Sequence, residues 1–214
     1  MKQSFYIPTQ ENDTLLLSII DLIKNNFASD ILEVKIENKE ATIFINQLNI
    51  LKFFLFLRDN KFTSFKQLID ITAIDYISQK PRFSIVYNLL SLVNNIRLKI
   101  IINVNEFEGI KSISSIYTSA DWLEREVYDM FGIYFTNHPN LKRLLNDFGF
   151  EGYPLRKDFP LTGYSEVFYN NETSKVEYKK LELPQAYRSF NYKNPWMENI
   201  EAETFAKINK ENKS

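Results

Sequence analysis

The stretch IRLKIIINV, residues 96–104, alternates apolar and other side chains in the manner of a β-strand. Successive side chains of a strand point to opposite faces of a sheet. One face of this stretch is entirely apolar and consists of Ile96, Leu98, Ile100, Ile102 and Val104. The pattern therefore predicts a strand with one buried face.

The residues just before this stretch predict its pairing partner. Within residues 82–93, four apolar side chains share one face: Phe83, Ile85, Tyr87 and Leu89. Asn94-Asn95 lies between the two stretches and suits a two-residue hairpin turn, because asparagine tolerates the left-handed backbone of such turns. We therefore expect an antiparallel hairpin here.

Further elements are predicted toward the N-terminus. Asp13 or Thr14 can cap a helix that ends around Phe27. Residues 33–45 indicate a strand, a tight turn and a second strand. Residues 48–58 are dense in Leu and Phe and indicate a buried helix, whereas residues 65–76 indicate strand or mixed structure.

The chain changes character in its last third. Ser114–Phe131 is predicted to be a helix that ends at Gly132, and all five glycines lie between positions 109 and 163. The predicted fold class is α+β, a mainly antiparallel sheet with helices packed on it, followed by an extended irregular C-terminal tail. We expect an α+β domain over residues 1–135 and a tail rich in Gly, Pro and aromatic residues over residues 136–214, which wraps a partner subunit.

Composition excludes several classes of function. The formal net charge is −1, which argues against a nucleic-acid binder that works by phosphate neutralisation. The chain has no cysteine, so it cannot form disulfides or hold an iron–sulfur cluster by itself. Its apolar runs are far shorter than a membrane span, and Met1–Gln10 resembles neither a secretory signal nor a mitochondrial presequence. We expect a chain that is soluble or peripheral to a membrane.

Two sets of residues are candidates for a functional site. Glu124, Arg125, Glu126 and Asp129 crowd one predicted helix, and charge pairing of Asp121 and Asp129 with Arg125 along its face explains them most simply. Docking to another protein is the alternative, and catalysis has little support. His138 has no second histidine near it, so a hydrogen-bonded structural role is favoured over metal ligation.

Residues 147–169 are rich in aromatic side chains but have neither helical nor strand periodicity. Such a segment either covers the surface of another protein or folds over its own core. No glycine fingerprint for a dinucleotide and no nucleophile elbow are present. The sequence therefore predicts no catalytic, cofactor-binding or metal-binding residues in this chain.

Residues 70–73, residues 83–91 and the residues from 124 onward carry a resemblance to a known family. They closely resemble the thirty-kilodalton subunit of respiratory complex I, whose organellar form is NADH dehydrogenase subunit 9. The resemblance covers about residues 65–196 and departs from the usual family residues at Tyr153, Phe168, Asn170, Asn171, Lys179 and Lys180. The signature residues, which are also the expected interface, are Glu124, Arg125, Glu126, Asp129, His138, Pro139, Arg143, Arg156, Lys157, Asp158, Phe159, Pro160, Gly163 and Tyr164.

The resemblance implies a non-redox scaffold subunit in the peripheral arm of proton-pumping NADH:ubiquinone oxidoreductase. Its expected partners are the forty-nine-kilodalton subunit and other subunits of the quinone-reducing module, in a hetero-oligomer on the matrix side of the mitochondrial inner membrane. Flavin and iron–sulfur clusters are expected in other subunits. An equivalent scaffold in a related NDH-type complex or an energy-converting hydrogenase is the alternative.

Overall fold

The computed structural model describes residues 9–188 and 190. The chain divides into two compact units, Met1–Gly163 and Tyr164–Ser214. The sequence pattern suggested a division near residue 135, whereas the contacts join residues 136–163 to the first unit. That the tail from residue 136 wraps a partner subunit stays a prediction.

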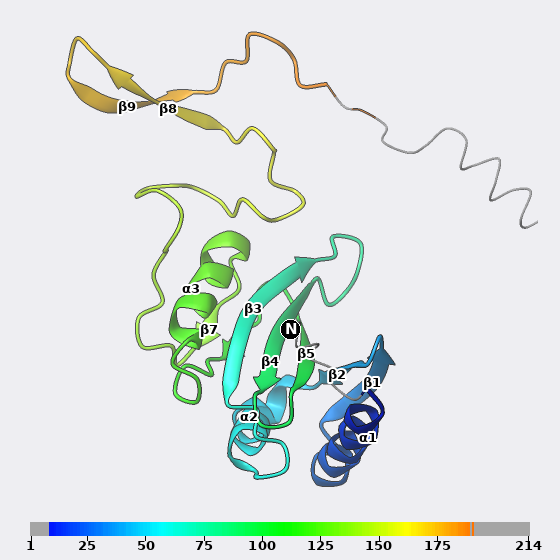
Figure 1. Cartoon of the computed structure of the whole chain (residues 1–214). Coiled ribbons are helices and arrows are strands. Elements are labelled where there is room, and N and C mark those ends of the chain that lie inside the picture. The colour runs from blue at the N-terminus through cyan, green and yellow to red at the C-terminus, as the bar shows by residue number, and fades with distance from the viewer. Residues whose placement is uncertain (1–8, 189, 191–214) are drawn as a thin grey trace, which may run out of the picture. The chain divides into compact units, whose positions relative to one another are not determined.

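The first unit is built on a five-stranded sheet (Figure 1). Strands β2 and β5 pair in parallel, and the other neighbours pair antiparallel, so the predicted α+β class with a mainly antiparallel sheet is confirmed. In sheet order the strands are β1 (Ile31–Glu37), β2 (Glu40–Ile45), β5 (Ile96–Val104), β4 (Phe83–Ser91) and β3 (Gln67–Asp75). A two-stranded parallel pair follows, made of β6 (Ile110–Lys111) and β7 (Phe135–Thr136).

Three helices complete the described part of the first unit: α1 (Thr9–Asn26), α2 (Ile50–Asp59, preceded by the 3-10 turn η1, Gln47–Asn49) and α3 (Ala120–Phe131). The five apolar residues that share a face of β5 are all buried, as the alternation predicted. The ring of Phe54 on α2 lies 5.0 Å from that of Tyr87 on β4, and Phe27 after α1 lies 5.1 Å from Phe53. These contacts place α2 against the apolar face of the sheet and tie α1 to α2.

Three local predictions need correction. The third helix begins at Ala120 and not at Ser114, because residues 113–117 form turns in which the Ile116 and Tyr117 amides bond to Ile113 O. The first helix begins at Thr9, four or five residues earlier than expected, and ends at Asn26. The connection from β4 to β5 has four residues and not two, since Ser91 pairs with Ile96.

The longer turn has a physical reason. Asn94 does not form a tight turn of its own, because its side-chain amide donates hydrogen bonds to Phe62 O at 2.8 Å and Thr63 O at 3.2 Å. Of the predicted Asn pair, Asn95 alone has a positive φ, of 51°. The loop after α2, which is distant in sequence, therefore decides the shape of this hairpin.

The second unit contains a hairpin that the sequence analysis did not predict. Strands β8 (Ser165–Asn170) and β9 (Lys175–Lys180) pair antiparallel, with Val167 opposite Tyr178 and Tyr169 opposite Val176. Asn170 Oδ1 accepts a hydrogen bond from the Glu172 amide at 2.9 Å and so shapes the turn. The rest of the described tail is irregular, as expected.

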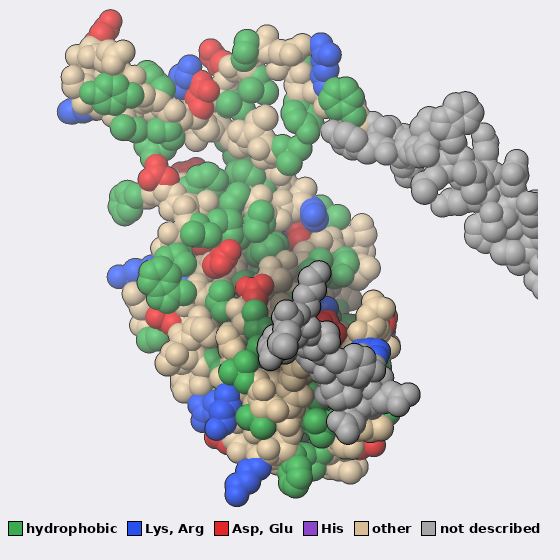
Figure 2. Space-filling model, in the orientation of Figure 1, with side chains coloured by type: hydrophobic (Ala, Val, Ile, Leu, Met, Phe, Trp, Pro, Cys, Tyr) green, Lys and Arg blue, Asp and Glu red, His purple; other side chains and the backbone are tan. Residues whose placement is uncertain are grey.

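The distribution of surface charge and the character of the helices agree with the net charge of −1 and the short apolar runs of the sequence. Acidic and basic side chains are interspersed over the visible face, and neither sign forms a continuous field there (Figure 2). Within the described ranges, no helix combines the length and the apolar character that crossing a bilayer requires.

The structure predicts an unusual effect at Tyr87. Its hydroxyl is buried and has no hydrogen-bond partner among the described residues, and burial raises the pKa of this hydroxyl well above its usual value. An unpaired buried hydroxyl costs about 1–3 kcal/mol, so Tyr87→Phe should raise the free energy of unfolding by roughly 1 kcal/mol. Urea unfolding measures this change, with Tyr87→Ala as the contrasting variant that loses the ring. A loss of stability in Tyr87→Phe would mean that the hydroxyl is satisfied in solution.

Candidate functional site

Glu124 is a fully buried carboxylate in the middle of the signature. Its Oε2 accepts a hydrogen bond from Ser112 Oγ at 2.6 Å, and its Oε1 accepts one from the Ile113 amide at 2.8 Å. Burial raises the pKa of Glu124 to about 7, and the negative charge of Asp121 adds to the shift, although the two hydrogen bonds oppose it. The carboxyl therefore holds the strand–turn segment before α3 against the helix.

His138 lies beside Asp121 and Glu124 of this helix. Its side chain is fully buried, and its Nδ1 accepts a hydrogen bond from the Asn140 amide at 3.1 Å. Since Nδ1 is an acceptor, the proton lies on Nε2, which faces Asp121 O at 3.0 Å and lies 3.9 Å from Glu124 Oε2. The hydrogen-bonded structural role that the sequence favoured for His138 is confirmed.

Asp129 is the second fully buried carboxylate of α3. Its Oδ2 accepts hydrogen bonds from three consecutive backbone amides, those of residues 144, 145 and 146, at 2.8–3.0 Å. Its Oδ1 accepts from the Asn146 side chain at 2.8 Å and pairs with Arg143 Nη1 at 3.1 Å. Burial alone would raise the pKa of Asp129, but these donors lower it overall. One carboxylate thus fixes residues 143–146 of the chain.

The simplest explanation of the charged helix is wrong. Arg125 has no ion pair with Asp121 or Asp129 among the described residues. Instead it donates to the carbonyl oxygens of Lys142 at 3.1 Å and Arg143 at 3.5 Å, and its guanidinium lies 5.6 Å from the Trp122 ring centre. The reason is that backbone amides and Arg143 already occupy Asp129, while these two carbonyls lie within reach of Arg125.

A second cluster of charges fixes the loop at residues 154–160. Arg82 donates from Nε and Nη2 to the two carboxylate oxygens of Asp75, at 2.7 and 2.9 Å. The same guanidinium lies 3.0 Å from Asp158 Oδ1 and 3.3 Å from Glu106 Oε2. Asp75 Oδ2 also accepts the Lys157 amide at 2.8 Å, and the hydrogen bond from Arg82 holds the pKa of Asp75 below its usual value.

Arg156 is used inside this chain. Its Nε donates to Phe131 O at 2.5 Å, its Nη1 pairs with Glu106 Oε1 at 2.5 Å, and its guanidinium lies 4.5 Å from the ring centre of Tyr153. Glu106 and the end of α3 meet two of its donors, and the expected contact of Arg156 with a partner subunit stays a prediction. Arg156 therefore anchors the loop to its own domain.

Gly132 is required by two constraints. It ends α3 with a positive φ of 75°, and a Cβ here would lie 2.6 Å from the Tyr153 ring and 2.7 Å from Arg156 Nη2. A side chain at this position would therefore displace the loop as well as strain the backbone.

The remaining signature residues are spread more widely. The Phe159 ring lies 5.9 Å from that of Phe150, and the Gly163 amide bonds to Pro160 O at 3.0 Å. Glu126 is half-buried on α3, and Pro139 borders a small surface pocket with Asp121. Tyr164 begins the second unit. The structure therefore brings most of the charged signature residues into two clusters but leaves Glu126, Pro139 and Tyr164 outside them.

The departures from the family pattern have partners of their own. Tyr153 stacks against Arg156 and also lies 5.2 Å from Arg143, measured from ring centre to guanidinium. Lys179 lies 5.5 Å from the Phe168 ring centre and pairs with Glu166 at 2.7 Å, while Asn170 bonds to Glu177. Lys180 is exposed at the end of β9, and Asn171 is exposed in the turn between β8 and β9.

The sequence analysis missed Asp75, Arg82 and Glu106. A signal was present for the first two, since they lie at facing ends of the two stretches predicted as strands, 65–76 and 82–93. Glu106 follows the stretch 96–104, which is also predicted as a strand. The three side chains therefore meet at one end of the sheet, where these strands begin or finish.

The chemistry of the two clusters depends on the groups that donate hydrogen bonds to their buried carboxylates. The buried carboxylates of Glu124, Asp129 and Asp75 each accept hydrogen bonds from backbone amides, and a hydroxyl or an arginine adds to them. In the part of the chain that the structure describes, no group of three or more His, Asp or Glu side chains could hold a metal ion. The arrangement is one that fixes loops.

The raised pKa of Glu124 leads to a pH-dependent prediction. Between about pH 4.5 and 7 the folded chain binds this proton and the unfolded chain does not, so the unfolding free energy falls as pH rises. The fall is at most about 3 kcal/mol, at 1.36 kcal/mol per pKa unit, and it is complete above pH 7. Glu124→Gln should abolish this slope in urea unfolding measured from pH 4.5 to 8. Glu126→Gln, on the same helix but without these contacts, is the control; parallel curves for the Glu124 variant and the parent chain would contradict the prediction.

The second cluster predicts where the chain can be shortened. A chain that ends at Gly163 should retain the stability of the first unit, because every charged contact of the loop is kept. A chain that ends at Asn146 keeps the Arg82–Asp75 and Arg82–Glu106 pairs but loses the contacts of Arg156, the Lys157 amide and Asp158. It should be less stable by about 2–4 kcal/mol, because each lost hydrogen bond costs about 0.5–1.5 kcal/mol. The midpoints and slopes of urea unfolding compare the two chains, and equal stabilities would show that the loop contributes nothing to the fold.

Comparisons with known proteins agree with the signature. The family model "Respiratory-chain NADH dehydrogenase, 30 Kd subunit" matches residues 43–165. NADH-ubiquinone oxidoreductase subunit 9 of Reclinomonas americana is 46% identical over 157 residues, which are 73% of this chain and 77% of that protein. A bacterial relative, an NADH-quinone oxidoreductase subunit of Rhodospirillum rubrum, is 43% identical over 168 residues, which are 78% of this chain and 79% of that protein.

A mitochondrial protein of Candida albicans, NADH dehydrogenase [ubiquinone] iron-sulfur protein 3, is 49% identical over 151 residues, 71% of this chain and 54% of that protein. Among solved structures, a chain of the archaeal membrane-bound sulfane sulfur reductase has a TM-score of 0.58 at 22% identity, covering 68% of this chain and 85% of that one, which shows a shared fold. The chain therefore belongs to the 30 kDa subunit family of the respiratory-chain NADH dehydrogenase and is the corresponding subunit of NADH:quinone oxidoreductase, complex I.

Proposed function

We propose that the chain is a non-redox core scaffold of the peripheral arm, which supports the quinone-reducing module and its assembly. The observation that carries this proposal is a division of labour within the signature. Its charged side chains fix loops inside the chain, whereas several apolar side chains of the same loops face outward. Phe148 is 99% exposed and Leu161 is 83% exposed.

The loop at residues 154–161 offers the best-defined contact surface. A pocket of about 320 Å³ is formed by Pro154, Leu155, Arg156, Lys157, Phe159, Pro160 and Leu161. Because Arg156 and Asp158 are anchored to the domain, the pocket is held open without a partner, and a preorganised apolar pocket of this kind suits a side chain of another protein. Lys157 adds an exposed positive charge at its border.

The partners we propose are the forty-nine-kilodalton subunit and other subunits of the quinone-reducing module. Membership of complex I implies hetero-oligomeric partners, and the outward apolar residues support a direct contact with them. We assign flavin and iron–sulfur clusters to other subunits, since this chain has no cysteine to ligate a cluster. Mitochondrial relatives support a peripheral position on the matrix side of the inner membrane.

A matched pair of variants tests the scaffold role. Leu161→Asp places a charge at the loop pocket, whereas Leu92→Asp places one at the exposed turn between β4 and β5. We expect Leu161→Asp to reduce the amount of assembled complex by roughly tenfold or more, since burying an unpaired charge at an interface costs several kcal/mol. Leu92→Asp should assemble normally.

Native gel electrophoresis and quinone reductase activity per assembled complex are the readouts. In the Leu161→Asp strain, the activity of each complex that does assemble should be nearly unchanged. Normal assembly with a selective fall in turnover per complex would contradict the scaffold role and place this loop near the quinone chemistry.

A further inference from the structure

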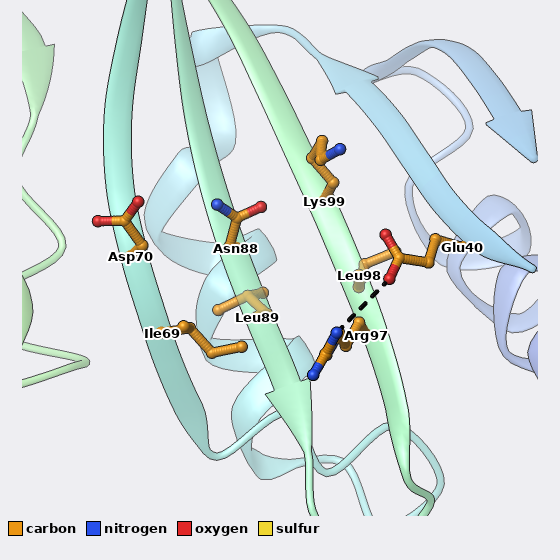
Figure 3. Close-up of a pocket in the computed structure, with 8 residues that line it drawn as sticks. All are labelled: Glu40, Ile69, Asp70, Asn88, Leu89, Arg97, Leu98 and Lys99. Atoms are coloured by element: carbon orange, nitrogen blue, oxygen red, sulfur yellow. Dashed lines mark ion pairs between the residues drawn. The ribbon is translucent and has the colours of Figure 1, made fainter. Parts of the chain in front are cut away.

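The sheet of the first unit has a face that none of the described helices covers. The α2 helix lies behind the sheet, on the side opposite Asp70, Asn88 and Lys99 (Figure 3). On the uncovered face, Asp70 on β3 is opposite Asn88 on β4, Asn88 is opposite Lys99 on β5, and Lys99 is opposite Thr42 on β2. These four residues form one polar row, which continues to Lys35 on β1; Lys35 is opposite Thr42 and pairs with Glu33.

None of the four side chains in this polar row has a hydrogen bond or an ion pair with another described residue, and all four are half-buried. Asp70, Asn88 and Lys99 line a surface pocket of about 500 Å³, which Ile69 and the Arg97–Glu40 pair also border (Figure 3). Solvated sheet faces ordinarily place opposite charges directly across from each other, because such pairs stabilise the sheet. Here an amide separates them.

Asp70 and Lys99 do not pair with each other. They lie two strands apart, which is about 10 Å at the backbone. Asn88 lies between them in the row, and the two side chains form no ion pair with each other. Each charge is therefore available to an opposite charge brought from outside the chain.

An apolar row runs alongside the polar one. Val86 on β4 is opposite Ile101 on β5, and Ile101 is opposite Phe44 on β2, all on the same face. A polar row with separated charges next to an apolar row is the pattern of a specific contact surface, in which apolar burial provides affinity and charge provides register.

We infer that this uncovered face binds a segment of another subunit of the complex, one that presents an apolar side chain to Ile101 and Phe44, a basic side chain to Asp70 and an acidic side chain to Lys99. The two charges of that segment must lie about 10 Å apart, which corresponds to about seven residues along a helix or three along an extended strand. The inference rests on membership of the complex and is separate from the loop at residues 154–161.

Photo-crosslinking in the intact complex identifies what covers this face. The photoreactive p-benzoylphenylalanine replaces Asn88 in the full chain, and the same residue in place of the exposed Lys61 is the control. We expect the probe at position 88 to crosslink to a peptide of another subunit that carries a basic and an acidic residue at the stated spacing. A crosslink to residues 1–8 of the same chain, a crosslink to a second copy, or no crosslink to any polypeptide would each overturn the inference.

Charge reversal tests the recognition itself. Asp70→Lys and Lys99→Glu should each weaken retention of the chain in the purified complex by roughly tenfold, because repulsion replaces an attraction. Reversing the crosslinked partner residue should restore retention. Asp21→Lys on α1 and Lys61→Glu, both at exposed positions, are the matched controls. Normal retention of both sheet variants would overturn the inference, whereas loss of assembly in Leu161→Asp with normal retention here would overturn it and leave the scaffold role intact.

Discussion

The guanidinium of Arg82 holds together three parts of the chain that are far apart in sequence. It bonds to Asp75 at the end of β3, to Glu106 after β5 and to Asp158 in the following loop. Removing one member of a half-buried cluster leaves the others without a partner, which costs more than the cluster contributes to stability when intact. The course of residues 154–160, and with it the loop pocket, depends on this contact.

Helix α3 also carries buried charges that are stable only because other groups of the chain bind them. It carries two carboxylates into the protein interior, and each is tolerated because backbone amides meet it there. Glu124 is met by one amide and one hydroxyl and is easily protonated, whereas Asp129 is met by three amides, an amide side chain and Arg143 and stays charged. The number of donors decides the direction of each pKa shift, since burial raises both. The helix thereby orders the segments on either side of it.

These arrangements suit the scaffold role that we propose for a chain without cysteine. Its family signature is largely a set of internal supports, so the residues that define the family need not touch another subunit. The surfaces that we propose for partners are apolar side chains on the supported loops and the uncovered face of the sheet. A rigid platform of this kind reduces the entropy lost on association.

The sequence by itself determined the β4–β5 hairpin, the buried helix that it indicated over residues 48–58, the helix end at Gly132 and the family. Each follows from a local period or a local backbone requirement, or from residues in a fixed order. Only the tertiary structure decided which partner each charged side chain has. Lys157 meets Asp75 across 82 positions, and Arg125 binds carbonyls and not the aspartates one turn away. Periodicity reports which face of an element is buried, whereas the partner of a long side chain depends on which distant segment the fold brings within its reach.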